Sequence, residues 1–571
     1  MKRAAKAFEL APWRFYFAVV LLAVLVVLMV WHLARVQVMP GEEKGFEFLQ
    51  HQGEARTVRE ERIAAYRGVI TDRNGEPLAV STPVHSLWLN PQLVSLEELP
   101  RLARALGINA QALERKVKAN QAREFLYLKR HLPPQDAEAV MALDIAGVSA
   151  ELEYRRYYPA AEVTAHLVGF TNVDERGQEG LELAYDEWLT GTQGAKQVQR
   201  DLRGRNIKEL QLLRAAEPGN DLALSIDLRL QYLAYRELKA AVQAHQARAG
   251  SIVVVDVSTG EVLAMANQPS YNPNDRSNLK PAAMRNRAMT DQFEPGSTMK
   301  PLTVMAALEA GRVQAHTPIE TSPGYIRVGK KTLLDPVNYG LIDVTKIITK
   351  SSQVGLTKVA LKMDPQEIRD MYVRLGFGQT SESGFPGESA GLLPNYTRWQ
   401  PIVQANYAFG YGLTVTAVQL AQAYSVVASG GVKRPVSLLK VDAHAEGKQV
   451  VKPNFTQSLV SMLKTVVEPG GTATRAKLDS YTVAGKTGTA HKVGPNGYEA
   501  SRYRSLFAGM APADDPRLAI VVVIDEPGAG KYFGGDVAAP VFARVTEGAL
   551  RMLQVPPEPK ALLAARSGGR P

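Results

Sequence analysis

The sequence has 571 residues, of which 45% are hydrophobic and 22% charged, so several globular domains with their own cores are expected. It contains no cysteine, which excludes a disulfide framework and thiol catalysis. The net charge of +10 is mild for this length, and no Lys/Arg block or basic–aromatic pattern indicates nucleic acid. The nine histidines form neither a tight cluster nor a His-Glu-x-x-His motif, so the sequence predicts no metal and no other cofactor.

The chain begins with a basic segment and an apolar one. Phe15–Leu33 contains no Asp, Glu, Lys or Arg, and a helix of this length spans roughly 28 Å, close to the thickness of a membrane core. Basic residues are denser before it, so the positive-inside rule places residues 1–14 in the cytoplasm and the chain beyond residue 36 outside. A cleaved signal peptide is the alternative. We favour an uncleaved anchor, because the apolar stretch is long and no small-x-small site follows it.

A mixed region is expected from residue 37 to about 220. Asn74-Gly75, between two short apolar runs, predicts a β-hairpin. Residues 96–143 repeat leucine and alanine at helical spacing, with a break at Pro133-Pro134. A short helix is expected to begin at Gly180. No nucleophile–base pattern stands out, so this region is interpreted as a spacer or docking module.

One large α+β domain is expected over residues 221–555. Residues 252–257 and 262–266 predict one hairpin, and residues 506–510 and 518–525 a second, with helices between them in the sequence. Hairpins at both ends indicate an antiparallel sheet flanked by helices. Residues 556–571 are rich in Pro, Ala, Arg and Gly and are expected to be disordered.

The motif Ser-x-x-Lys occurs four times, beginning at Ser277, Ser297, Ser437 and Ser461. Only Ser297 opens an apolar run, Pro301–Leu308, which predicts a buried helix. Ser297 and Lys300 would share one helical face. A buried lysine with a lowered pKa can take the proton of a serine hydroxyl and make it a nucleophile.

Two further motifs follow in the same domain. Lys350-Ser351-Ser352-Gln353 offers hydroxyls and an amide, and Lys486-Thr487-Gly488-Thr489 is expected on a strand. Gly485 and Gly488 would let a ligand approach the strand closely, and a cation beside hydroxyls suits a substrate carboxylate. Each motif alone is equally compatible with an ordinary surface strand or loop.

In this order, the three motifs resemble those of the penicillin-binding proteins and serine β-lactamases. Further stretches are similar to class B penicillin-binding proteins, closest to the division-specific penicillin-binding protein 3 of Gram-negative bacteria: the anchor, Arg67–Ala79, Glu294–Ser297, Tyr411-Gly412 and Tyr503–Gly509. The resemblance covers nearly the whole chain. It implies an anchor over residues 1–36, a non-catalytic pedestal or dimerisation domain over 37–220, and a serine β-lactamase-like transpeptidase domain over 221–555.

The resemblance implies a peptidoglycan D,D-transpeptidase that β-lactams acylate. Ser297 would attack the carbonyl between two D-alanines, Lys300 would be its base, and Ser351 would relay protons. Lys486 would lie near both and lower the pKa of Lys300 by charge repulsion. The backbone N–H groups of Ser297 and Thr489 would form the oxyanion hole.

The resemblance also implies a binding surface for the stem peptide. Thr487, Gly488 and Thr489 would hold the substrate carboxylate, and Tyr503, Tyr532 and Phe533 would wall the acyl group, although a core role fits these aromatic residues too. One position departs from the family, whose middle motif is Ser-x-Asn. Gln353 adds one methylene, and such a shift of a positioning group can cost on the order of a hundredfold in rate.

Three alternatives stay open. A D,D-carboxypeptidase or β-lactamase would send water rather than an amine to the acyl-enzyme. A membrane-bound penicillin sensor would acylate without cross-linking, and a division scaffold would catalyse slowly. The resemblance implies that a glycan polymerase of the SEDS class and other division proteins contact the anchor and pedestal. It also implies an inner-membrane location, a periplasmic catalytic domain and a site at the division septum.

Overall fold

A computed structural model describes residues 11–38, 47–48, 57–201, 206–441, 446–494 and 497–559. The expected cytoplasmic tail, apart from residues 11–14, and the expected disordered tail, beyond residue 559, lie outside these ranges. The chain divides into two compact units. The first comprises Met1–Ala65, Pro83–Tyr154 and Thr192–Pro218, and the second comprises Tyr66–Thr82, Arg155–Gly191 and Gly219–Pro571.

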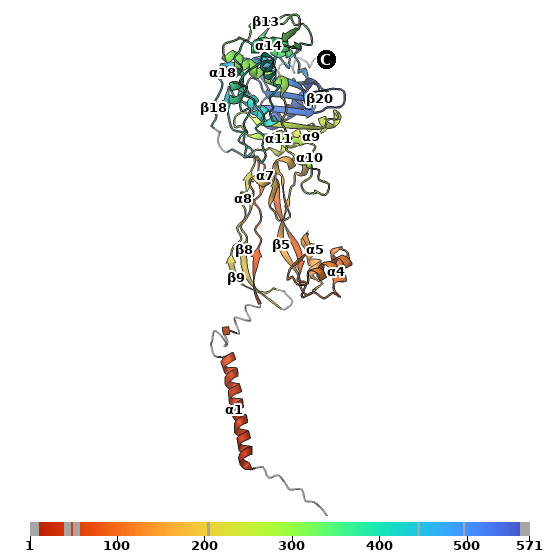
Figure 1. The fold of residues 1–571 in the computed structure, drawn as a ribbon, viewed down its shortest axis with the longest axis vertical. Coiled ribbons are helices and arrows are strands. Elements are labelled where there is room, and N and C mark those ends of the chain that lie inside the picture. Colours follow the sequence, from red (N-terminus) through yellow and green to blue (C-terminus); the bar gives the residue numbers. More distant parts are fainter. Residues whose placement is uncertain are drawn as a thin grey trace, which may run out of the picture. The chain divides into compact units, whose positions relative to one another are not determined.

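Helix α1 (Pro12–Gln37), in red in Figure 1, contains the predicted apolar stretch. Within the described ranges, it is the one helix long and apolar enough to cross a membrane. It has no buried residue, as expected of a helix whose apolar side chains would face lipid. The predicted membrane helix is therefore confirmed in length and composition.

The first unit contains a three-stranded antiparallel sheet and a small helical core. The sheet has the order β1-β8-β9, with β1 at Val58–Ile63, β8 at Gly194–Arg200 and β9 at Asn206–Arg214. The helical core is formed by α3 (Leu99–Leu106), α4 (Ala110–Ala119) and α5 (Pro134–Met141), beside β4 (Leu126–Leu132). The expectation of helix throughout residues 96–143 is wrong for Leu126–Leu132, which pairs with β3 (Pro77–Leu89). Leu126 and Leu132 are buried at its ends, and tertiary pairing overrides the local helical spacing.

The second unit takes in two short segments from the N-terminal part of the chain. The Asn74-Gly75 hairpin forms between β2 (Ile70–Thr71) and β3, and β2 also pairs with β10 (Leu222–Ala223). The second segment supplies the predicted short helix, α7 (Gly180–Ala184), whose Glu182 is fully buried and bonds Arg67 and Arg156. Other short elements here are η1 (Ala161–Val163), α6 (Ala165–Val168), β6 (Phe170–Thr171), β7 (Gly177–Glu179) and α8 (Asp186–Leu189); β5 (Val148–Tyr157) runs into this unit from the first.

The core of the second unit is a five-stranded antiparallel sheet of order β12-β11-β21-β20-β19. Its strands are β11 (Ala249–Asp256), β12 (Val262–Gln268), β19 (Ala484–Gly494), β20 (Gly497–Ala511, blue in Figure 1) and β21 (Leu518–Asp525). The two predicted hairpins are confirmed. In β21 every residue from Leu518 to Ile524 is buried, so helices cover both faces of the sheet.

Helices α9 (Leu228–Ala244) and α20 (Ala539–Met552) pack on each other and on the sheet, and the fully buried α17 (Ala417–Ala428) packs on β11, β20 and β21. The predicted helix after Ser297 is confirmed as α12 (Lys300–Glu309). The remaining elements are α10 (Pro281–Met284), α11 (Arg287–Thr290), β13 (Pro318–Glu320), β14 (Tyr325–Val328), β15 (Lys331–Leu334), β16 (Leu341–Asp343), α13 (Val344–Lys350), α14 (Gln353–Ala360), α15 (Pro365–Arg374), α16 (Pro401–Ala408), β17 (Val432–Lys433), β18 (Lys448–Gln449), α18 (Pro453–Lys464), η3 (Thr474–Ala476) and α19 (Gly534–Val537).

Candidate active site

Ser297 lies in a tight turn that leads into α12. The turn η2 (Gly296–Met299) is 3-10 helical, and Gly296 enters it with a φ of 55°, which glycine adopts without strain. The Thr298 hydroxyl donates to the Pro295 carbonyl at 2.8 Å, and Tyr424 of α17 donates to the Thr298 carbonyl at 2.9 Å. The turn is therefore held by its own chain and by the helix behind it.

Lys300, the first residue of α12, contacts Ser351 of the second motif. Its Nζ donates to the Ser351 carbonyl at 2.6 Å and lies 3.2 Å from the Ser351 hydroxyl. Lys300 is 1% exposed, and this burial lowers its pKa to about 7, against an opposing effect of the Asp335 carboxylate. About half of such a lysine is a neutral amine at pH 7, which is the form that can accept a proton.

Lys486 lies on β19, which runs beside the Ser297 turn. It is fully buried, and its Nζ donates to the Thr487 carbonyl at 3.1 Å. Burial first, and then the charge of Lys300, hold the pKa of Lys486 well below its usual value. Burial, which the sequence analysis named as the cause of a lowered lysine pKa, is the leading cause of the low pKa of Lys300.

One pocket of about 720 Å³ collects residues from all three motifs. Seven predicted site residues line it: Ser297, Lys300, Ser351, Gln353, Thr487, Thr489 and Phe533. The other four adjoin them, with Lys486 and Gly488 on β19, Tyr503 on β20, and Tyr532 next to Phe533. Segments separated by almost two hundred residues in the sequence therefore converge at one place. The other three Ser-x-x-Lys serines do not line this pocket.

The three aromatic residues contact one another in a row that ends at Phe533 in the pocket lining. Tyr503 stacks on Tyr532 with ring centres 4.1 Å apart, and Tyr532 lies 4.5 Å from Phe533. Phe533 is 57% exposed and lines the pocket, so most of its ring is open to a ligand. Of the two roles expected from the sequence, this exposure favours a binding wall at Phe533 over a core position.

The glycines of β19 have a packing role that the sequence analysis did not foresee. A Cβ at Gly485 would lie 2.5 Å from the Phe507 ring, and one at Gly488 would lie 3.0 Å from the Thr298 methyl and 3.1 Å from the Pro295 carbonyl oxygen. Gly488 thus allows β19 to approach the Ser297 turn. The close approach of a ligand to its backbone stays a prediction.

Several lining residues were not predicted as site residues: Leu334, Asp335, Pro336, Lys350, Thr472, Thr474, Arg475 and Gly534–Asp536. Asp335 is the most buried acid among them, at 9% exposed, and its carboxylate bonds the Ser351–Gln353 turn. Thr472 exchanges a hydrogen bond with Thr487 at 3.0 Å. No short motif surrounds either residue, so local sequence carried no signal for them.

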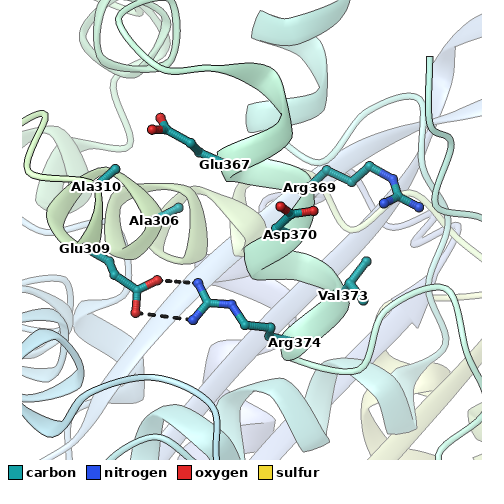
Figure 2. Close-up of a pocket in the computed structure, with 8 residues that line it drawn as sticks. All are labelled: Ala306, Glu309, Ala310, Glu367, Arg369, Asp370, Val373 and Arg374. Atoms are coloured by element: carbon teal, nitrogen blue, oxygen red, sulfur yellow. Dashed lines mark hydrogen bonds and ion pairs between the residues drawn. The ribbon is translucent and has the colours of Figure 1, made fainter. Parts of the chain in front are cut away.

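Figure 2 shows a second pocket, of about 630 Å³, between the end of α12 and α15. Glu309, at the end of α12, forms a two-bond ion pair with Arg374 of α15. Arg374 also donates to the Val450 carbonyl at 2.6 Å. These contacts fix the far end of the helix whose first residue is Lys300.

Comparison with known families agrees with this geometry. A family model described as the penicillin-binding protein transpeptidase domain matches residues 250–547, and one described as the penicillin-binding protein dimerisation domain matches residues 62–224. The chain belongs to the class B penicillin-binding proteins.

Two individual relatives show which members of this class the chain resembles. The chain is 46% identical to the probable peptidoglycan D,D-transpeptidase PbpC of Pseudomonas aeruginosa, over 90% of this chain and 91% of that protein. It is 44% identical to the peptidoglycan D,D-transpeptidase FtsI of Escherichia coli K12, over 90% and 88%. The likeness to the division-specific members is therefore confirmed.

Solved structures give the same result. The transpeptidase domain of Burkholderia pseudomallei penicillin-binding protein 3 is 42% identical, with a TM-score of 0.55 over 59% of this chain and 97% of that one. Penicillin-binding protein 3 of Mycobacterium tuberculosis in complex with aztreonam is 26% identical, with a TM-score of 0.67 over 87% and 98%. The predicted α+β fold is confirmed.

Proposed function

We propose that this protein is a peptidoglycan D,D-transpeptidase that cross-links stem peptides through a serine acyl-enzyme and is acylated by β-lactams. The observation that carries the proposal is the buried Lys300, whose pKa is lowered to about 7 in a pocket that it shares with Ser297 and Ser351. The names of the relatives PbpC and FtsI support the same activity.

In the acylation step, the neutral amine of Lys300 takes the hydroxyl proton of Ser297. The oxygen attacks the carbonyl carbon between the two D-alanines, and a carbon–oxygen bond forms. The tetrahedral intermediate collapses with cleavage of the carbon–nitrogen bond. The departing D-alanine amine receives the proton from Lys300, with Ser351 as the relay at 3.2 Å from Nζ.

In the second step, an amine of a neighbouring stem peptide attacks the ester carbonyl. The amine loses a proton to Lys300 through Ser351, a new amide bond forms, and Ser297 regains its proton as the ester breaks. The backbone N–H groups of Ser297 and Thr489 stabilise the oxyanion in both steps, and one such donor is worth roughly 3–4 kcal/mol. Thr487 and Thr489 hold the substrate carboxylate.

The finer assignments belong to the same proposal. Residues 1–36 anchor the chain in the inner membrane with the N-terminus in the cytoplasm, and the catalytic domain of residues 221–555 lies in the periplasm at the division septum. The anchor and the pedestal of residues 37–220 contact a SEDS-class glycan polymerase and other division proteins. The length of α1 and the match to FtsI support these assignments.

The test is covalent labelling of the full chain in detergent with a fluorescent penicillin. Stable label on the peptide that contains Ser297, absent from Ser297→Ala, is expected. Ser461→Ala is the matched control, because Ser461 opens another Ser-x-x-Lys motif on the exposed side of α18 and should label normally. Label that clears within seconds would indicate a β-lactamase, and a folded protein without label would contradict the proposal.

A further inference from the structure

Asp335 lies at the edge of the pocket, directly after β15. It is 9% exposed and lines the pocket together with Ser351 and Gln353. A carboxylate so deeply buried must be matched by hydrogen-bond donors or it would be strongly destabilising. The hydrogen-bond donors around the carboxylate therefore show which segment Asp335 stabilises.

These donors come from Ser352, which caps α14, and from the first two residues of α14. The Asp335 Oδ2 accepts from the Ser352 hydroxyl at 2.6 Å, and Oδ1 accepts from the backbone N–H of Gln353 at 2.6 Å and of Val354 at 3.3 Å. Ser352 is itself fully buried, and its hydroxyl oxygen accepts from Gly355 N at 2.9 Å. One carboxylate therefore holds the Ser351–Gln353 turn on the side that leads into α14.

The turn needs such a restraint. Ser351 has a φ of 56°, in the left-handed region that is strained for a residue other than glycine. In this conformation its carbonyl and hydroxyl both face Lys300 Nζ, at 2.6 and 3.2 Å. A relaxed turn would draw Ser351 away from Lys300 and move the Gln353 side chain in the pocket.

Asp335 also acts on Lys300 through its charge. The charge of Asp335, from the loop after β15, acts on Lys300, and the charge of Lys300 acts on Lys486, while the face of Phe409 lies 5.4 Å from Lys300 Nζ. The negative charge of Asp335 raises the pKa of Lys300 and so limits the lowering that burial causes. Removal of that charge would leave Lys300 neutral at lower pH.

We propose that Asp335 is a positioning residue of the acylation reaction, which holds the Ser351–Gln353 turn in place and balances the charge of Lys300. This proposal rests on the proposed function, because it concerns the rate of Ser297 acylation. It adds an element that none of the three motifs contains, and it makes the loop after β15 a determinant of how Gln353 meets a ligand.

Two variants separate the two effects. Asp335→Asn keeps the shape and the oxygen that accepts from the backbone N–H groups, but it removes the charge and the oxygen that accepts from the Ser352 hydroxyl. Ser352→Ala removes the hydroxyl that Asp335 holds but leaves the charge. Asp343→Asn is the matched control, because Asp343 caps the N-terminus of the neighbouring helix α13 by accepting from Lys346 N at 2.7 Å, away from the pocket lining.

The experiment measures the second-order rate constant for fluorescent-penicillin acylation of the full chain in detergent across pH. For Asp335→Asn we expect the rate constant on its plateau at high pH to fall by about tenfold or more. We also expect the acid limb, the part of the profile where the rate rises with pH, to move to lower pH. For Ser352→Ala we expect the lower plateau with the acid limb unmoved, and for Asp343→Asn neither change.

A wild-type plateau in Asp335→Asn, or a lower plateau without a displaced limb, would overturn the proposal. If Asp335→Asn does not fold, Ser352→Ala decides, and a wild-type rate there overturns it. Failure of the proposed function is a separate result, since the unmodified chain would then carry no label on Ser297.

Discussion

At the scale of single residues, Lys300 sets the pH dependence of the site. Its pKa is lowered to about 7 by burial, and the neutral amine is the reactive form. The acylation rate should therefore rise with pH through about 7 and level off above it, because a group with a lowered pKa gives up its proton as the pH passes that value.

This prediction is checked by measuring the acylation rate between about pH 5 and pH 9, with the hydrolysis of the reagent alone subtracted. A rate that still rises at the upper end of this range, without levelling off, would indicate the ordinary lysine pKa of about 10.4 and show that Lys300 is not buried in the working enzyme.

Gln353 is a second single residue that is expected to affect the acylation rate. It lines the pocket at the position for which the resemblance to the family implies asparagine, so its amide would reach one methylene further. Gln353→Asn should raise the rate of acylation by penicillins, by up to about a hundredfold. The exposed Gln243→Asn on α9 is the control and should leave the rate unchanged. An unchanged or lower rate for Gln353→Asn would mean that the pocket is already adapted to glutamine.

At the scale of elements, the loop between α16 and α17 supports the Ser297 turn. Gly410 has a φ of 82°, its carbonyl accepts from Gly296 N at 3.2 Å, and a Cβ there would lie 2.5 Å from the Gly296 carbonyl oxygen. Gly410→Ala should push the turn away and lower acylation by about a hundredfold.

The control for this prediction is Gly430→Ala. Gly430 has a similar φ of 75°, but a Cβ there would meet no atom within 4 Å, so the substitution adds the strain without the clash. It should cost about 1–2 kcal/mol of stability and leave acylation nearly unchanged. Equal rates for the two variants would contradict a specific role of Gly410.

At the scale of the whole molecule, a buried ion cluster joins two N-terminal segments within the second unit. Glu182 is fully buried and bonds Arg67 and Arg156, each at 2.6 Å. Glu182→Gln would remove the counter-charge of the buried Arg156 and leave Arg67 with the Asp186 carboxylate at 2.7 Å, at a cost of about 3–5 kcal/mol. Chemical unfolding of the full chain, followed by fluorescence, should show an early transition.

The matched variant is Glu547→Gln, which breaks an exposed pair with Arg551 on α20 and should cost roughly 0.5 kcal/mol or less. A transition of Glu182→Gln no earlier than that of Glu547→Gln would show that the cluster contributes little to the stability of this unit.

The sequence by itself determined the features that depend on short-range patterns. The apolar stretch of α1, the hairpins around Asn74-Gly75 and residues 258–261, and the buried helix after Ser297 each follow from periodicity and turn chemistry over a few residues. The three motifs, in their order, also predicted which residues meet in one pocket. The strand Leu126–Leu132 was missed, because its partner β3 lies far away in the sequence.

The tertiary structure alone decided the chemistry of these residues. The pKa of Lys300 depends on burial by helices and strands that are remote in the chain, and no local pattern encodes it. Asp335 reaches the Ser351–Gln353 turn, and Gly488 admits the Ser297 turn, only because the sheet and helices bring those segments together. The motifs indicate which residues react, whereas tertiary packing determines the distances between them, their charge states and their burial.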